Sequence, residues 1–176
     1  MVFAGMVLAR AAAIYEKNNG GGLFANQTQS YVPAMTGDII KCDIVVSEES
    51  AFYPFVEIPD YLIAMSQSAY DKFIEQTNDG TRIIFDGDVF KSRSDQVHYD
   101  IPASRKAEGK WKNRSANMIM LGALIGISHL LGEESVLEAI ANASPSDKVE
   151  INKKAFSEGL NIGRAIIDSK GTGESG

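Results

Sequence analysis

Apolar residues recur at helical spacing over the first fifteen positions of the chain. They stand at positions 2, 3, 6, 7, 8, 11, 12, 14 and 15, which predicts a helix with a broad apolar face over 1–15. Three consecutive glycines at 20–22 favour left-handed and open backbone conformations, so they indicate where this helix ends. Further helices are predicted at 69–76, 116–131, 133–142 and 148–169. Ser115 is expected to cap the long buried helix at 116–131, and Gly132 to end it.

Short runs of apolar and β-branched residues between these helices predict strands. The runs lie at 23–31, 39–46, 61–65, 81–85 and 98–101. Strands that alternate with helices predict an α/β fold of three layers, in which a mostly parallel sheet is covered by helices on both faces. The basic segment 105–114 is expected to be a solvated turn. A length of 176 residues predicts a single domain over 1–170, followed by a flexible tail at 171–176.

Charge and the scarcity of cysteine and histidine argue against several classes of function. The chain has 17 basic and 23 acidic residues and a pI near 4.9, whereas nucleic-acid surfaces carry dense Lys/Arg patches. The single cysteine, Cys42, excludes an internal disulfide and an iron–sulfur cluster held by this chain alone, since a cluster typically needs about four thiolates. The two histidines, His98 and His129, lack metal-site spacing.

The apolar segments are also too short to cross a membrane. The run at 118–131 has 14 residues, whereas a bilayer crossing needs about 20, so it predicts a buried helix. The N-terminus has no basic segment ahead of its apolar stretch and no clear cleavage site, which argues against a signal peptide. We therefore expect a cytoplasmic protein that binds neither membrane nor nucleic acid.

Two groups of polar residues are candidates for chemistry, and each has a plainer interpretation. Asp60, Asp86 and Asp88 stand next to predicted strands and can line a crevice, although such residues are more often caps and turn formers. Six residues with amide or hydroxyl side chains follow one another at 26–31. They can hydrogen-bond a ligand or a partner chain, or they can belong to an exposed edge strand, and the sequence favours neither.

A series of short segments, taken in order, resembles the gamma subunit of the 2-oxoacid:ferredoxin oxidoreductases over residues 1–167. The segments are Gln27-Thr28-Gln29-Ser30-Tyr31, Tyr53-Pro54, Pro59-Asp60, Ala64-Met65-Ser66-Gln67, Pro102-Ala103, Ala116-Asn117-Met118, Leu121-Gly122-Ala123, and Asn152 with Ala155-Phe156 and Gly159. No single segment is decisive, and the signal comes from their number and order. The form at 27–31 is closer to the 2-oxoglutarate enzymes than to the pyruvate enzymes.

The resemblance implies a Rossmann-like gamma-type domain within a multi-subunit enzyme that oxidatively decarboxylates a 2-oxoacid, uses coenzyme A and reduces ferredoxin. It places thiamine diphosphate on alpha and beta subunits, and iron–sulfur clusters on the beta subunit or on a ferredoxin-like delta chain. This chain would then carry no catalytic residue and would support assembly, with part of the coenzyme A environment. We expect an exposed apolar patch for partner subunits, with Phe52, Tyr53, Phe55 and the edge at 27–31 as candidates.

The chain departs from the family pattern in the loop after Tyr31. Family members have Gly-Pro-Glu-Ala-Arg-Gly-Gly there, and this sequence has Val-Pro-Ala-Met-Thr-Gly-Asp at 32–38. Thr36 replaces an arginine, which is a natural partner for phosphate or carboxylate, so the loop is less suited to an anion. Tyr31, Thr36 and Gly37 are the residues that the resemblance offers as contacts to coenzyme A or to a partner chain.

A second departure concerns the start of the chain. Family members begin with a strand and a glycine-rich turn before the first helix, and the backbone N–H groups of such a turn can bind an anion. Losing the strand would remove about six buried apolar residues at about 1.5–3 kcal/mol each, or about 9–18 kcal/mol, against a domain stability of about 5–15 kcal/mol. We therefore expect the sequence to start downstream of the natural N-terminus.

The sequence leaves two alternative functions open. One is a stand-alone nucleotide-binding α/β protein, against which the absent glycine turn argues. The other is a pure interaction module that binds no ligand. Co-purification with thiamine- and cluster-bearing chains would distinguish the enzyme subunit from both alternatives. Thermal stabilisation by a nucleotide would favour the stand-alone nucleotide-binding protein.

Overall fold

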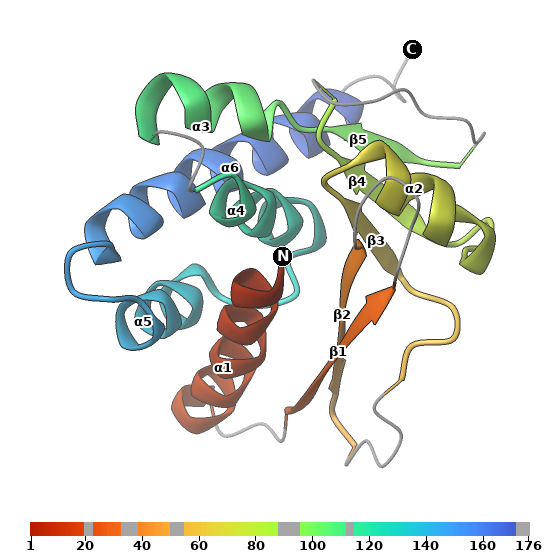
Figure 1. Ribbon diagram of the computed structural model, residues 1–176. Coiled ribbons are helices and arrows are strands. Elements are labelled where there is room, and N and C mark those ends of the chain that lie inside the picture. The colour runs from red at the N-terminus through yellow and green to blue at the C-terminus, as the bar shows by residue number, and fades with distance from the viewer. Residues whose placement is uncertain (20–22, 33–38, 50–54, 88–95, 112–114, 172–176) are drawn as a thin grey trace.

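A computed structural model describes residues 1–19, 23–32, 39–49, 55–87, 96–111 and 115–171 (Figure 1). The elements follow in the order α1 Val2–Asn19, β1 Phe24–Val32, β2 Ile39–Ser47, β3 Tyr61–Ala64, α2 Gln67–Phe73, the 3-10 turn η1 Ile74–Gln76, β4 Arg82–Phe85, β5 His98–Asp100, α3 Ala103–Trp111, α4 Ala116–Ser128, α5 Glu133–Ala143 and α6 Val149–Gly171. The five strands and five helices predicted from the sequence are all present, with ends that differ by a few residues. Residues 172–176 of the expected tail lie outside the described part.

The strands form two separate sheets. β3, β4 and β5 lie in that order and all run parallel, with Leu62 opposite Ile83 and Ile84 opposite Tyr99. β1 and β2 form an antiparallel hairpin, with Phe24 opposite Ser47 at one end. The predicted α/β class with a parallel sheet is therefore confirmed, and the antiparallel hairpin stands beside that sheet.

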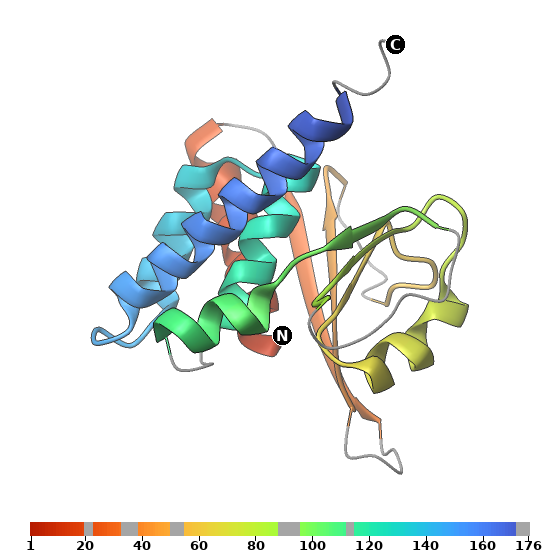
Figure 2. The ribbon, with the colours of Figure 1, turned by 90° about the horizontal axis from the view of Figure 1, so that it is seen from above.

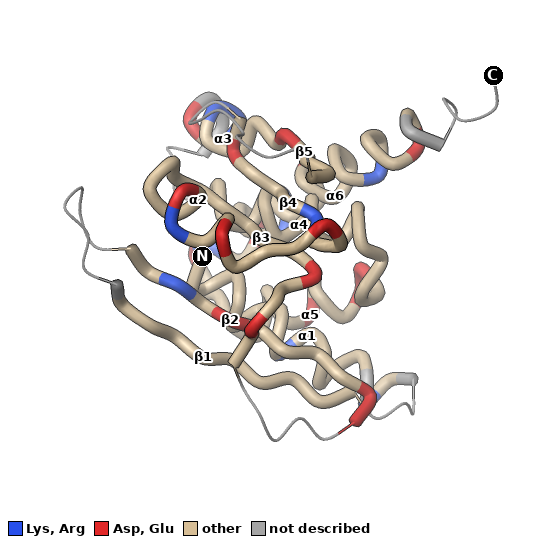
Figure 3. Tube along the Cα trace, turned by 90° about the vertical axis from the view of Figure 1, so that its right-hand side faces the viewer, with Lys and Arg blue, Asp and Glu red and all other residues tan. Residues whose placement is uncertain are grey.

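Helices lie on both sides of the strands. Figure 2 shows α2 on one side of the strands and α1, α4, α5 and α6 on the other. α1 packs against the hairpin and against α5, and α4 packs along α6. The described helices contain none that is both long and apolar enough to cross a membrane. Basic and acidic positions are interspersed over the face shown in Figure 3.

α4 is the centre of the core because it is apolar on every side. All its residues from Met118 to Ile127 are buried. It meets α6 through glycines on both helices, and the two backbones touch: a Cβ on Gly122 would lie 2.0 Å from the Phe156 carbonyl oxygen, and one on Gly159 would lie 1.9 Å from that of Ile119. The absence of side chains at these glycines sets the spacing between α4 and α6.

The segment 105–114, expected to be a solvated turn, is helical in its described part. α3 runs from Ala103 to Trp111. Ala103 and Ala107 are fully buried one helical turn apart, so a narrow apolar strip holds α3 on the core in spite of its charged residues. Lys106 also donates from Nζ to Glu158 Oε1 of α6 at 2.6 Å. The charge run concealed this helix because the buried residues in its described part are the small Ala103 and Ala107.

The end of α4 also differs from the expectation. The helix stops at Ser128, and His129 takes a left-handed conformation with φ of 52° while its N–H donates to Ile125 O. Gly132, expected to end this helix, instead precedes α5 as its N-cap. Ser115 stands at the N-cap of α4, but its side chain makes no capping hydrogen bond. Ser66 caps the shorter helix α2, because its Oγ accepts from Ala69 N at 3.2 Å.

Candidate functional site: a cleft and a projecting hairpin

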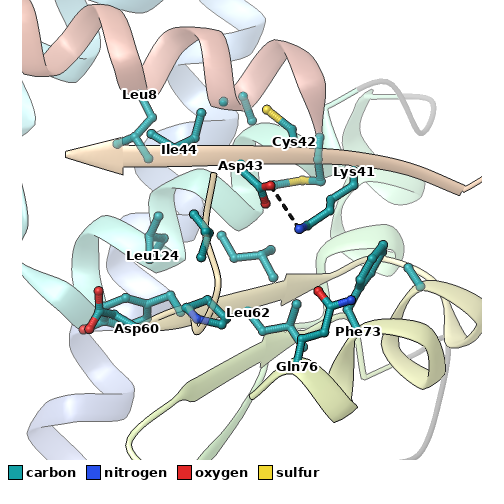
Figure 4. A pocket seen from close by; sticks show the side chains of 18 of the residues that line it. Leu8, Lys41, Cys42, Asp43, Ile44, Asp60, Leu62, Phe73, Gln76 and Leu124 are labelled. Atoms are coloured by element: carbon teal, nitrogen blue, oxygen red, sulfur yellow. Dashed lines mark ion pairs between the residues drawn. The ribbon is translucent and has the colours of Figure 1, made fainter. Parts of the chain in front are cut away.

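A cleft of about 1260 Å³ separates the hairpin from the parallel sheet (Figure 4). β2 forms one long side, and the segment that leads into β3 forms the other. α1, α4 and α2 supply the remaining walls through mostly apolar side chains, namely Ala4, Leu8, Leu121, Leu124, Ala69 and Phe73. The cleft is therefore built from elements that are far apart in the sequence.

Three adjacent residues of β2 bring polar atoms into this apolar space. Lys41 and Asp43 form an ion pair of 3.0 Å between Nζ and Oδ2, and both side chains are largely buried. The Lys41 ammonium also lies 5.4 Å from the centre of the Phe73 ring, so the lysine reaches from β2 to α2 across the cleft. Because Asp43 balances this charge, the pair offers little attraction to an anionic ligand.

Cys42 is half-buried between these two residues. Gln27 Nε2 donates to Cys42 Sγ at 3.2 Å and to the Val2 carbonyl oxygen at 3.4 Å. Burial raises the pKa of the Cys42 thiol above its ordinary value, more than the hydrogen bond from Gln27 lowers it. The thiol is therefore protonated at neutral pH, which is the form with poor nucleophilicity and poor metal affinity.

Of the aspartates singled out in the sequence, the two in the described part, Asp60 and Asp86, lie at different places. Asp60 lines the cleft. Asp86 is fully buried, and its Oδ2 accepts from Ser104 N at 2.9 Å, so it caps α3, whereas its Oδ1 has no hydrogen-bond partner among the described residues. Asp88 lies outside the described residues. The cap interpretation therefore holds for Asp86, and the crevice interpretation holds for Asp60.

Of the three proposed contact residues, Tyr31 lies in the described part, and Thr36 and Gly37 lie outside it. Tyr31 is 69% exposed near the end of β1, and Ile40, its partner across the hairpin, is 50% exposed. Figure 2 shows this end of the hairpin projecting past the helices. Two large apolar side chains side by side on a projecting end are typical of a contact surface.

The polar run at 26–31 divides between two roles. Gln27 hydrogen-bonds inward to Cys42 and to the start of α1, so its amide is used within the fold. Gln29, Ser30 and Tyr31 are exposed toward the projecting end. Of the predicted patch residues, Phe55 is 57% exposed and borders the cleft, whereas Phe52 and Tyr53 lie outside the described residues.

Sequence reasoning missed the Lys41–Asp43 pair. The available signal was two opposite charges with i, i+2 spacing, on one face of an otherwise Ile- and Val-rich strand. In the described residues no group of three or more His, Cys, Asp or Glu side chains could hold a metal ion. The arrangement as described is a binding geometry, with an apolar cleft beside an exposed apolar hairpin end.

Comparison with known proteins gives consistent results over nearly the whole chain. Residues 1–162 match the family described as pyruvate ferredoxin/flavodoxin oxidoreductase. The chain is 34% identical over 171 residues to the 2-oxoglutarate synthase subunit KorC of Methanocaldococcus jannaschii, an alignment that covers 94% of this chain and 89% of that protein.

Solved structures show the same fold. The gamma subunit of a keto/oxoacid ferredoxin oxidoreductase from Geobacter sulfurreducens superposes with a TM-score of 0.76 at 26% identity, covering 93% of this chain and 91% of that one. The 2-oxoglutarate:ferredoxin oxidoreductase from Magnetococcus marinus, solved with 2-oxoglutarate, coenzyme A and succinyl-CoA bound, gives a TM-score of 0.72 at 23% identity. In that case 93% of this chain matches 28% of the longer one.

Proposed function

Because the chain belongs to the pyruvate ferredoxin/flavodoxin oxidoreductase family, we propose that it is the gamma-type subunit of a 2-oxoglutarate:ferredoxin oxidoreductase. The observation that carries this proposal is the 34% identity to a 2-oxoglutarate synthase subunit along 94% of the chain. The subunit belongs to an oxidoreductase but holds no complete active site of its own. Residues 1–170 act as its single domain, and the assembly works in the cytoplasm.

The redox groups of this enzyme belong to other chains. One cysteine cannot replace the four thiolates that typically hold an iron–sulfur cluster, and the Cys42 thiol is kept protonated by burial. Thiamine diphosphate supplies carbanion stabilisation for the decarboxylation when it is bound on the alpha and beta subunits. This subunit assembles with those two subunits, and with a ferredoxin-like delta chain where one is present.

The hairpin end with Tyr31 and Ile40 is the part of this subunit that docks on the catalytic chains. Tyrosine is enriched in protein interfaces because it combines a large apolar ring with a polar tip. Burial of an exposed Tyr–Ile pair in a partner pocket removes apolar surface from water, which stabilises the complex. On the described part of the hairpin, these are the large apolar side chains that stand free of the core at the projecting end.

Tyr31, with Thr36 and Gly37, also contributes to the coenzyme A environment. The described residues of the hairpin fit the apolar and aromatic parts of this ligand better than its phosphates, because the cation Lys41 is neutralised by Asp43. Tyr31 can stack on a base or pack along an extended chain. The partner subunits then supply the charges for the phosphate groups.

The test combines reconstitution with a matched set of variants. Purified alpha and beta subunits are titrated with the wild-type chain, with Tyr31→Ser/Ile40→Ser, and with Ile151→Ser, which removes a comparably exposed apolar residue on α6. Association is measured by light scattering, and activity is measured as 2-oxoglutarate- and coenzyme A-dependent reduction of ferredoxin.

We expect the wild type and Ile151→Ser to bind near one to one, and the double variant to bind at least about tenfold more weakly, which is a loss of about 1.4 kcal/mol. A wild-type chain that stays alone, folded and monomeric, contradicts the subunit assignment. A double variant that binds as tightly as Ile151→Ser contradicts the docking role of the hairpin and leaves the subunit assignment standing.

A further inference from the structure

β1 has an outer edge that no described strand pairs with. Within the described residues β1 is hydrogen-bonded to β2 alone, in an antiparallel register that runs from Phe24 opposite Ser47 to Val32 opposite Ile39. Figure 3 shows β1 on the outer side of the hairpin, with β2 between it and β3. Every second residue of a strand directs its N–H and C=O groups to the same side, so about half of these groups in β1 point away from the hairpin.

This edge carries none of the features that usually prevent strand edges from pairing with another chain. Protected edges are typically short, bulged, or marked by lysine or proline. β1 has nine residues, its register is unbroken, and positions 24–32 hold no proline. Residues 18–37 contain no charged side chain, although 23% of the chain is charged. The outer strand of the parallel sheet, β5, has three residues and ends in Asp100. The edge of β1 is therefore suited to receive a further strand.

The residues of β1 are chemically symmetric about Thr28, which indicates what that strand is. Moving outward from Thr28, equivalent positions are occupied by Gln27 and Gln29, by Asn26 and Ser30, and by Ala25 and Tyr31. A second copy of β1, antiparallel and centred on Thr28, places the two members of each pair opposite each other. Thr28 then faces itself across a two-fold axis. Because both strands are uncharged, no like charges oppose each other there, although each chain has a net charge of −6.

We propose that the outer edge of β1 is a self-association surface, which pairs with β1 of a second copy of this chain about a two-fold axis at Thr28. The two hairpins then form one four-stranded antiparallel sheet in the order β2, β1, β1, β2. A sheet of four strands is more stable than a two-stranded hairpin, because the inner strands satisfy main-chain groups on both sides. Gln29 and Ser30, which are exposed in the single chain, gain cross-strand neighbours in this sheet.

This contact is compatible with docking of the hairpin end on the catalytic chains. Strand pairing uses the main-chain groups at the edge of β1. The side chains of Tyr31 and Ile40 lie opposite each other and are exposed on one face of the hairpin, which the edge contact leaves accessible. Two copies can therefore pair with each other while each one binds its own catalytic chains.

Position 28 tests the pairing directly, because a residue there faces its own copy. The mass of the full chain is measured by sedimentation equilibrium from about 1 µM to about 500 µM, because mass action favours a dimer at high concentration. The samples are the wild type, Thr28→Lys, Thr28→Glu, an equimolar mixture of these two variants, and Gln29→Lys. Gln29→Lys is the matched control: it adds the same charge one position along the exposed strand, where it faces Gln27 of the second copy.

We expect the wild type and Gln29→Lys to rise from 19.0 kDa toward twice that mass. Thr28→Lys and Thr28→Glu alone should each dimerise at least about tenfold more weakly, because like charges then lie directly opposite each other. The mixture of the two should dimerise at least as well as the wild type, because opposite charges then meet. A wild type that stays at 19.0 kDa at every concentration overturns the proposal, and so does a Thr28→Lys chain that dimerises as tightly as the wild type.

Amide hydrogen exchange of the wild type gives a second measurement that needs no variant to fold. We expect the outward amides at 24–32 to exchange at least about tenfold more slowly at the highest concentration than at the lowest, and the amides at 61–64 of the parallel sheet to keep their rates. Equal rates at 24–32 overturn the proposal. Protection of these amides that appears only when catalytic subunits are added also overturns it, because a strand of another chain then occupies the edge.

Discussion

Replacing Gly159 with alanine adds a methyl group that clashes with main-chain atoms of α4. The added Cβ would lie 1.9 Å from the Ile119 carbonyl oxygen, 2.7 Å from its carbonyl carbon and 2.9 Å from its Cα. All three atoms are main-chain atoms of a buried helix, so no side-chain rotation relieves the contact. α6 must move away from α4 by about 1 Å or more to reach an ordinary separation.

The expected loss of stability combines two opposing effects. Overpacking of a filled core typically costs about 1–3 kcal/mol, and the upper part of this range applies because the obstacle is backbone. Alanine regains about 1 kcal/mol over glycine inside a helix. The net destabilisation is therefore about 1–2 kcal/mol, which lowers the Tm of a chain of this size by about 2–8 °C.

Thermal and urea unfolding of the wild type and two variants measure this effect. Gly132→Ala is the matched control, because its Cβ would lie 3.8 Å from the Tyr15 ring and its φ of −65° suits any residue. Because Gly132 is the N-cap of α5, where alanine is less favourable than glycine, we expect the control to lose up to about 1 kcal/mol, which is less than the loss in Gly159→Ala. A Gly159→Ala chain with a Tm equal to or above that of the wild type would refute the contact between the two backbones.

A double substitution tests the same contact by additivity. Gly122 and Gly159 face each other across the same helix pair. Once the first alanine has pushed the helices apart, the second meets less resistance, so Gly122→Ala/Gly159→Ala should cost clearly less than the two single changes together. Full additivity would mean that each glycine is packed independently.

Three further predictions concern a cap, a helix end and a thiol. Asp86→Ala should lower the free energy of unfolding by about 0.5–2 kcal/mol, because it removes the acceptor for Ser104 N at the start of α3. Urea titration measures this loss, and an unchanged urea midpoint would contradict the capping role. His129→Gly should raise the Tm by about 2–4 °C, since glycine adopts the left-handed conformation at φ of 52° without strain, and a lower Tm would contradict this account. Burial raises the pKa of Cys42 above 9.0, so the unfolded chain loses the thiol proton first as the pH rises. Stability should therefore fall between pH 8 and pH 10 in the wild type more than in Cys42→Ser, and parallel pH profiles of the two chains would refute it.

Local patterns in the sequence were enough to find most elements. The spacing of apolar residues located α1 and the three C-terminal helices, and the β-branched runs located the strands, because burial of one face imposes a period of 3.6 or 2 on the chain. The sequence analysis missed α3 because the buried residues in its described part, Ala103 and Ala107, are small and give a weak hydropathy signal between charged residues.

The end of α4 illustrates a different limit. Gly132 was expected to end the helix because glycine takes the left-handed conformation most easily, yet His129 takes it instead. Leu131 is buried three positions from the helix end, and the chain must turn early to place it in the core. Burial of Leu131 therefore outweighed the preference of glycine for the left-handed position at the helix end.

By itself the sequence determined the α/β class, the positions of the strands and most helices, and, through the order of many short segments, the family. Only the tertiary structure decided that β1 and β2 pair as a hairpin, that Gln27 turns inward while Tyr31 and Ile40 face outward, and that Cys42, Lys41 and Asp43 border an open cleft. The physical reason is the range of the interactions. A helix or a strand is encoded by neighbours a few residues apart, whereas the cleft is formed by β2 and β3, whose edges remain unpaired because no described strand lies between them.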